Sequence, residues 1–133
     1  MNARYPLVSQ RAGHRCEYCH APEAIFNFPF EVEHVIPPGN QGPDDDANLA
    51  LACRACNLHK ADHVTGVNGL TNSEIKLFHP RQDAWEDHFQ VHAETGLIEG
   101  KTALGRATVM RLRMNSTIQL EARRQWMKLG LFP

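Results

Sequence analysis

The sequence contains no apolar run that approaches the roughly 18 residues needed to cross a lipid bilayer, so we expect no membrane-spanning helix. Its first residues, Met1 to Pro6, lack the apolar stretch of a secretion signal. No internal repeat and no low-complexity segment is present. These absences favour a cytoplasmic protein without a membrane partner, and 133 residues suffice for one domain with a small appendage.

Basic residues are scarce in most of the chain. Residues 1–100 contain seven Lys/Arg and fourteen Asp/Glu, a balance of −7, whereas residues 101–133 contain seven and one, a balance of +6. A basic end on a chain of net charge −1 suggests a polyanionic partner, because phosphates are bound largely through counterion release. The alternative interpretation is a solvated face that only improves solubility.

Only four cysteines occur, and their spacing is more informative than their number. Cys16 and Cys19 form one C-x-x-C motif, and Cys53 and Cys56 form a second. Two disulfides are not expected in a reducing compartment, whereas two C-x-x-C turns can give zinc its tetrahedron of four thiolates. Such a closed shell leaves no position for a substrate, so we predict a structural zinc site. A redox dithiol or four unrelated cysteines are the alternatives.

Short secondary-structure elements are predicted around the cysteine pairs. A short helix is expected over residues 6–12, before Gly13. The segment 26–36 is rich in Phe, Val and Ile and predicts one or two strands. Residues 49–52 predict a further strand, and a short helix is expected over residues 54–62.

The second half of the chain predicts helices near its end. The segment 65–72, with two glycines, is typical of a linker or surface loop. Apolar residues then repeat at helical spacing in two stretches, which predicts two C-terminal helices with apolar faces. We expect Trp126 and the methionines to lie in the core. The repeating residues are Ala103, Ala107, Met110 and Met114, then Ile118, Ala122 and Leu129.

Polar residues that could take part in catalysis lie between the two cysteine pairs. The stretch Glu31-Val32-Glu33-His34-Val35-Ile36-Pro37 ends the first predicted strand, and alternation places Glu33 and His34 on opposite faces unless the strand stops there. A lone histidine beside apolar residues is usually structural. Here, however, Asn48 opens the second strand, and Asn57-Leu58-His59-Lys60 follows the last cysteine.

This ordered set resembles the HNH endonuclease family. The family pattern is a C-x-x-C, an acid–His–x–x–Pro strand, an Asn before an apolar strand, and a second C-x-x-C followed by [His/Asn]-x-x-Lys. The resemblance covers about residues 11–62 and implies a ββα-metal core, also called a His-Me finger. The matching residues are Cys16, Cys19, Glu33 to Pro37, Asn48, Cys53, Cys56, Asn57 and Lys60.

The resemblance implies an endonuclease that hydrolyses DNA phosphodiester bonds, with RNA as an alternative substrate. His34 would be the general base, and Asn48 would fix the loop that carries it by hydrogen bonding. Glu33 and Asn57 would hold a catalytic Mg²⁺ or Mn²⁺. Lys60 would meet a phosphate. Two departures are that Glu33 stands where the family often has Asp, and Asn57 where many members have His.

Neighbouring polar residues have open roles. His59 would point away from the site on a helix, and Glu31 is either a supporting residue or a solvated strand residue. The run Asp44-Asp45-Asp46 could mimic a metal site, but three acids in a Gly/Pro-containing loop are usually a solvated turn. Arg81 and His88 could reach a substrate, although structural roles are favoured.

We therefore predict an α+β fold with a zinc-bound HNH core over residues 1–64. A mostly helical extension over residues 65–133, similar to one on some bacterial HNH proteins, would pack on this core. The alternative function is a zinc-stabilised nucleic-acid-binding module that cuts nothing, although a pure binder would not need the polar trio between the cysteine pairs. Four basic residues would grip the DNA backbone without reading bases: Arg106, Arg113, Arg124 and Lys128.

Overall fold

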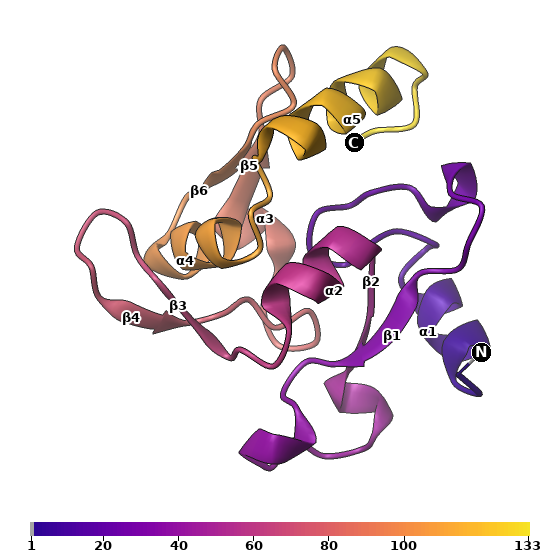
Figure 1. Cartoon of the computed structure of the whole chain (residues 1–133), viewed down its shortest axis with the longest axis vertical. Helices are drawn as coiled ribbons and strands as arrows, with labels where there is room; N and C mark the ends of the chain where they lie inside the picture. The colour runs from indigo at the N-terminus through magenta and orange to yellow at the C-terminus, as the bar shows by residue number, and fades with distance from the viewer. Residues whose placement is uncertain (1) are drawn as a thin grey trace.

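The computed structural model describes residues 2–133 (Figure 1). Its N-terminal part consists of α1 (Tyr5–Arg11), β1 (Glu31–His34), β2 (Leu49–Ala52) and α2 (Arg54–Lys60). Short 3-10 turns at Glu23–Ile25, Pro38–Asn40 and Asp46–Asn48 connect these elements. None of the helices within residues 2–133 has the length and hydropathy of a membrane span.

The β1–β2 hairpin is the centre of the N-terminal part. The two strands are antiparallel, with Glu31 opposite Ala52 and His34 opposite Leu49. All four residues of β2 are buried, because α1 and α2 both pack against the hairpin. This explains why β2 is a continuous apolar run rather than an alternating one. The predicted β2 is confirmed at both ends.

The first strand is shorter than the prediction for residues 26–36. Residues 26–30 lie outside any strand, and β1 begins only at Glu31. Pro29 lacks the N–H group that a strand ladder requires, and it restricts the backbone of the residue before it. The apolar composition of this segment therefore reflects packing, since Phe30 is buried and its ring meets Phe26 edge-on.

The helices of the N-terminal part begin and end for local reasons. Helix α1 has Pro6 in its first turn, where the missing N–H has no consequence, and the chain turns at Gly13 with a φ of +63°. Helix α2 is capped by Cys53, whose sulfur accepts from the Cys56 amide. Both predicted helices are confirmed to within two residues at each end.

The second half contains more strand than the sequence predicted. It comprises β3 (Thr65–Val67), β4 (Glu74–Lys76), α3 (Trp85–His88), β5 (Phe89–Val91), β6 (Ile98–Gly100), α4 (Ala103–Arg111) and α5 (Thr117–Lys128). The two predicted C-terminal helices, α4 and α5, are confirmed. The antiparallel pairs β3–β4 and β5–β6 were not predicted. Trp126 and Met114 are buried as expected, whereas Met110 is exposed.

The interpretation of residues 65–72 as a linker is wrong for residues 65–67, which form β3 and pack under α4, whereas residues 68–72 form the surface loop that was the alternative. A Cβ atom at Gly66 would lie 2.8 Å from the carbonyl oxygen of Ala107 on that helix. A Cβ atom at Gly100 would overlap the backbone nitrogen of Arg106 on α4, and one at Gly105 would overlap the backbone oxygen of His88 on α3. These glycines thus mark close packing rather than flexibility.

The second half packs directly on the loop that carries the first cysteine pair. The indole Nε1 of Trp85 donates to the backbone oxygen of Tyr18 over 2.8 Å, and the Trp85 ring stacks on His20. Arg81 forms an ion pair with Glu17. One cluster of buried apolar residues draws on both halves of the chain. The extension is therefore part of the same core as the cysteine loop.

Candidate metal centre and histidine site

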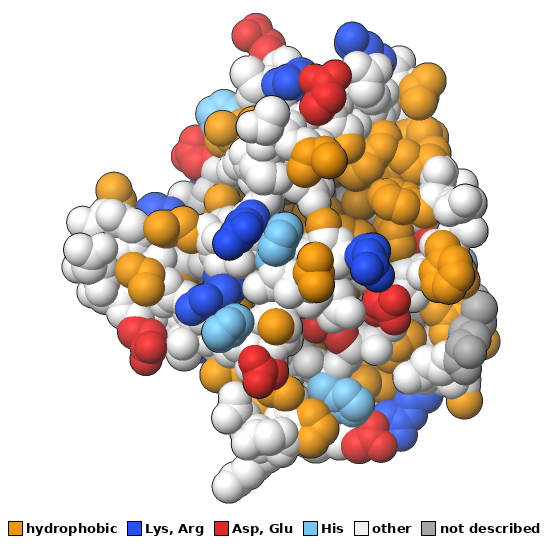
Figure 2. All heavy atoms as spheres, in the orientation of Figure 1, with side chains coloured by type: hydrophobic (Ala, Val, Ile, Leu, Met, Phe, Trp, Pro, Cys, Tyr) orange, Lys and Arg blue, Asp and Glu red, His pale blue; other side chains and the backbone are white. Residues whose placement is uncertain are grey.

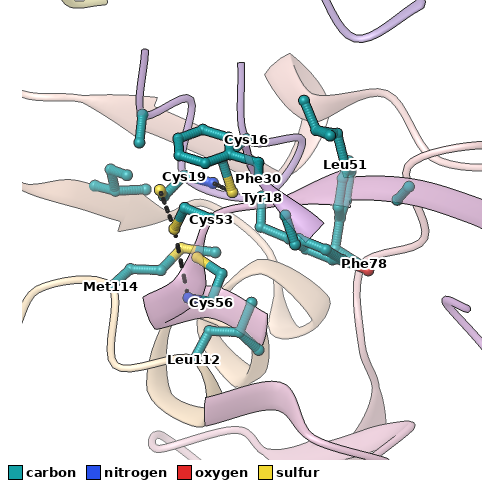
Figure 3. Close-up of a cluster of buried hydrophobic side chains, with 14 of the residues drawn as sticks. Cys16, Tyr18, Cys19, Phe30, Leu51, Cys53, Cys56, Phe78, Leu112 and Met114 are labelled. Carbon is teal, nitrogen blue, oxygen red and sulfur yellow. Dashed lines mark hydrogen bonds between the residues drawn. The ribbon is translucent and has the colours of Figure 1, made fainter. Parts of the chain in front are cut away.

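The four cysteines come together between two elements that are far apart in the sequence. Cys16 and Cys19 lie in the turn after α1, whereas Cys53 and Cys56 lie at the start of α2 (Figure 3). All four are buried, and their sulfur atoms lie within 4.8 Å of one another. The sulfurs of Cys19 and Cys53 are 3.8 Å apart. A tetrahedral zinc site with Zn–S bonds of about 2.3 Å has sulfur–sulfur edges of about 3.8 Å. The cluster therefore has the dimensions of a four-thiolate zinc site.

Four buried thiolates require a compensating charge. Hydrogen bonds among the sulfurs, together with burial, raise the pKa of Cys19 and Cys56. For Cys53, hydrogen bonds with the other three cysteines lower the pKa and outweigh the effect of burial. Without a cation, Cys53 is thus favoured as a thiolate, whereas Cys19 and Cys56 are favoured as thiols. A divalent cation removes this conflict, because it stabilises all four thiolates at once.

Arg123 on α5 is a buried cation without a carboxylate partner among the described residues. Its guanidinium donates to the backbone oxygens of Gly96 and Met114 at 2.8 and 2.6 Å, and its Nε is buried without a hydrogen-bond partner. Burial lowers the pKa of Arg123, and the charges of the four cysteines oppose that shift. Met114 packs beside the sulfurs (Figure 3). Arg123 therefore supplies positive charge near the cysteine cluster.

His34 ends β1 and has a side chain that is 32% exposed. Its Nε2 lies 2.9 Å from Oδ1 of Asp44 in the loop between the strands. Arg4 contacts the same carboxylate oxygen at 3.0 Å. The hydrogen bond with His34 and the nearby charge of Arg4 lower the pKa of Asp44. Asp44 is therefore more than a solvated turn residue.

Asn48 holds the loop that follows His34. Its side-chain oxygen accepts from the Ile36 amide at 2.9 Å, and its side-chain nitrogen donates to the backbone oxygens of Ile36 and Pro43 at 2.8 and 2.9 Å. Asn48 is buried, so these bonds are shielded from water. The hydrogen bonds that the sequence predicted from Asn48 to this loop are present.

Glu33 faces the opposite side of β1 from His34, as strand alternation predicted. It is 7% exposed, accepts a hydrogen bond from the Tyr18 hydroxyl, and lies 3.7 Å from Nζ of Lys60. Burial raises the pKa of Glu33 to about 7, against the opposing charge of Lys60. A carboxyl group enclosed in this way does not offer its oxygens to a divalent cation. The expected metal ligation by Glu33 does not fit this geometry.

Lys60 is likewise placed inside the protein. Its side chain is 1% exposed, and Nζ donates to the backbone oxygen of Val35 at 2.8 Å. The expected phosphate contact does not fit this position, because the ammonium group is covered. Instead, Lys60 joins α2 to the residue that follows His34. Asn57 lies one turn earlier on α2 and is half-buried, so it shares the helix side that faces β1.

The other polar residues considered for the site mostly contact the protein itself. His59 approaches the backbone oxygen of Leu112 at 3.2 Å and so turns toward the extension, away from β1. Glu31 is exposed at the start of β1. Besides the ion pair between Arg81 and Glu17, His88 lies 2.7 Å from the hydroxyl of Thr102, which caps α4. These positions favour the structural roles for Arg81 and His88.

Two of the four basic residues expected to grip DNA have protein partners. Arg106 donates to the Asn68 side chain at 3.0 Å, and Arg124 pairs with Glu121 at 2.9 Å. Arg113 lies in the turn beyond α4, because that helix ends at Arg111. Arg113 and Lys128 are exposed. Figure 2 shows Lys, Arg and His side chains spread over the face that carries α2 and α4, with acidic side chains interspersed among them.

Sequence reasoning missed three residues of this region: Tyr18, Arg4 and Asp44. The Asp44 loop was visible as an acidic run, but no pattern connects it to Arg4, which lies 40 residues away. Tyr18 stands inside the first C-x-x-C turn, so its position next to the metal centre was available. Its partner Glu33 could be found only from the fold.

The hairpin β1–β2 and the helix α2 form a ββα unit. A histidine ends its first strand, and the two cysteine pairs lie before the first strand and at the start of the helix, as in ββα units of the zinc type. Residues 16–63 match the sequence model of the HNH endonuclease family. The matched segment contains all four cysteines, together with His34, Asn48 and Asn57. No curated protein and no solved structure matches the chain.

Proposed function

We propose that the protein is an endonuclease that hydrolyses DNA phosphodiester bonds with His34 as general base. The observation that carries this proposal is the position of His34, which lies half-exposed at the end of β1 in an HNH segment. Its two neighbours in the chain, Glu33 and Val35, are both buried. Strand alternation turns His34 away from both neighbours, so its ring is accessible to a substrate.

The reaction requires few groups. His34 accepts a proton from a water molecule as the water oxygen forms a bond to phosphorus. The bond from phosphorus to the 3′ oxygen breaks, and that oxygen takes a proton from solvent. An imidazole suits this task because its pKa in water lies near neutrality. Asn48 supports the step indirectly, since its hydrogen bonds fix the loop that follows the base.

The four cysteines are proposed to hold one structural zinc ion. The ion would supply a cross-link between the turn after α1 and the start of α2, which the short hairpin alone does not provide. Tyr18 lies in the same turn as Cys16. A zinc ion in this site would therefore also fix the position of the Tyr18 hydroxyl, which donates a hydrogen bond to Glu33. The metal centre thereby supports the strand that ends in His34.

The two residues expected to bind a catalytic Mg²⁺ or Mn²⁺ are not arranged as a metal site. Of the two expected ligands, Glu33 is enclosed by Tyr18 and Lys60, and Asn57 alone remains on the side of α2 that faces β1. Glu33 and Asn57 therefore do not form a site for a divalent ion in this arrangement. The roles that fit Glu33 and Lys60 are positional, because together they tie β1 to α2 and to the cysteine turn.

Incubation of plasmid DNA with the zinc-loaded protein, with and without added Mg²⁺ or Mn²⁺, tests this function. We expect nicked or linear product, with single-stranded RNA as a parallel substrate. The alternative, a module that binds nucleic acid without cutting it, predicts a shifted DNA band and no product under any of these conditions. Among the basic residues, exposed Arg113 and Lys128 are the better candidates for phosphate contacts, since Arg106 and Arg124 have protein partners.

A further inference from the structure

We infer that Asp44 and Arg4 form a positioning pair for His34, holding its imidazole with the proton on Nε2 and leaving Nδ1 to act as the base. This inference rests on the proposed function. The same Oδ1 of Asp44 lies 2.9 Å from His34 Nε2 and 3.0 Å from Nη1 of Arg4. Arg4 also donates through Nη2 to the backbone oxygen of Asp44 at 3.2 Å.

The chemistry of the contact selects the tautomer. An ionised carboxylate accepts hydrogen bonds and cannot donate them, so the ring nitrogen facing Asp44 must carry the hydrogen. In a neutral imidazole the other nitrogen then has the free lone pair. The exposed carboxyl of Asp44 is ionised at neutral pH, and the hydrogen bond with His34 and the charge of Arg4 lower its pKa further. The pair therefore fixes which nitrogen of His34 is able to take a proton from water.

The loop that carries Asp44 is held on both sides. Before it, the backbone oxygen of Pro43 accepts from Asn48, and after it, the Asp45 side chain accepts from the Ala47 amide. Arg11 on α1 adds donors to the backbone oxygens of Asp46 and Leu49 at 2.8 and 2.6 Å. Arg4 and Arg11, at opposite ends of α1, thus both donate hydrogen bonds to the acidic loop. These bonds hold the loop backbone in place and keep the Asp44 carboxylate next to His34.

The sign of the charge argues against a role in substrate attraction. A carboxylate beside the proposed base repels the phosphates of DNA, and a surface built only to bind a polyanion would place a cation there. The three consecutive acids also differ in their contacts. Asp44 bonds to His34 and Asp45 caps a turn, whereas no side-chain hydrogen bond of Asp46 is found within residues 2–133. Asp46 is therefore a matched control.

The test is steady-state cleavage of a DNA duplex by the full zinc-loaded chain. Removing the carboxylate of a buried catalytic triad lowers kcat by about 10⁴. Because Asp44 is largely exposed and water can replace it, we expect Asp44→Ala to lower kcat by about 10-fold to 100-fold. KM should stay unchanged or fall, since a repulsive charge is removed. Asp44→Glu should restore part of kcat, Arg4→Ala should lower it less, and Asp46→Ala should match the wild type.

A second measurement is independent of turnover. The ¹⁵N shifts of the His34 ring, recorded in alkaline buffer where imidazole is neutral, report which nitrogen carries the hydrogen. We expect the Nε2–H form in the wild type and in Asp46→Ala, and a mixture in Asp44→Ala. An Nδ1–H form in the wild type, or an unchanged kcat in Asp44→Ala, overturns the inference. If His34→Ala cuts as well as the wild type, the proposed function fails instead, and the ring shifts still decide whether Asp44 selects the tautomer.

Discussion

Glu33 and His34 are adjacent in the chain, yet they lie on opposite sides of β1 and in opposite environments. Glu33 is enclosed by Tyr18 and Lys60, whereas His34 reaches the surface and meets Asp44. This separation divides the acid–histidine pair of the motif into a structural carboxylate and a candidate base. It also predicts that substitutions at the two positions have different consequences.

Replacing Glu33 should lower the free energy of unfolding more than it lowers the rate of DNA cleavage by the folded protein. Glu33→Ala leaves the ammonium group of Lys60 buried without its carboxylate, which typically costs about 3–5 kcal/mol in unfolding free energy. Glu33→Gln also removes the charge but keeps the shape and an amide oxygen that can accept from the Tyr18 hydroxyl or from Lys60, so it should lose less stability than Glu33→Ala and, once folded, cut DNA nearly as well as the wild type. Denaturant unfolding and a Mg²⁺ or Mn²⁺ titration of cleavage check both statements. A well-folded Glu33→Gln that needs far more divalent ion would instead establish Glu33 as a metal ligand.

The cysteine cluster should contain one zinc ion per chain. Structural zinc sites contribute apparent binding free energies on the order of 10 kcal/mol or more to folding. Cys53→Ser removes one ligand and also the sulfur that caps α2, so we expect a metal-depleted and poorly folded protein. Elemental analysis and circular dichroism measure the two effects. Well-folded, reduced wild-type protein without zinc would be inconsistent with this site.

Arg123 should influence zinc retention through its charge. A zinc ion with four thiolates carries a net charge of −2, and Arg123 is the buried cation on the α5 side of it. We expect Arg123→Met to release zinc to a chelator faster than Arg123→Lys, which keeps the charge but loses most of the hydrogen bonds. Arg124→Met, on the same helix and paired with Glu121, is the control. Equal release from the Met and Lys variants of Arg123 would assign it a packing role alone.

Glu23 should make stability depend on pH in the acidic range. Burial alone would raise the pKa of Glu23, but hydrogen bonds from the Phe30 amide, His14 and Tyr5 outweigh it and lower the pKa. A carboxyl with a lowered folded-state pKa contributes stability that is fully present above its ordinary pKa of 4.5. That contribution is lost as the pH falls through the folded-state value.

Urea unfolding of the wild type and Glu23→Gln across pH checks this expectation. The wild type should be the more stable protein at neutral pH, and the difference should shrink as the solution is acidified below the ordinary glutamate pKa. Glu31→Gln, at an exposed position, is the control and should show no such trend. A difference that stays constant into strong acid would contradict the assignment.

Local sequence signals predicted the elements that frame the site. The apolar run of β2, the C-x-x-C turns and the Asn48 position were readable because each depends on residues close in sequence. The burial of Glu33 was not, since Tyr18 and Lys60 reach it from 15 and 27 positions away. The contact between His34 and Asp44 depends on how a loop folds back, and the acidic run alone favoured a solvated turn. The hairpin β3–β4 was missed because its glycines serve packing against α4.

The rate of plasmid cleavage by His34→Ala tests the central claim most directly. Loss of a general base typically lowers the rate by about 10²–10⁴, and His34 is partly exposed, so the variant should keep its zinc content and melting temperature. His63→Ala, an exposed histidine just beyond α2, is the matched control and should cut like the wild type. The account predicts that His34→Ala, purified free of other nucleases, leaves the plasmid essentially supercoiled. Cleavage by His34→Ala at the wild-type rate would contradict it.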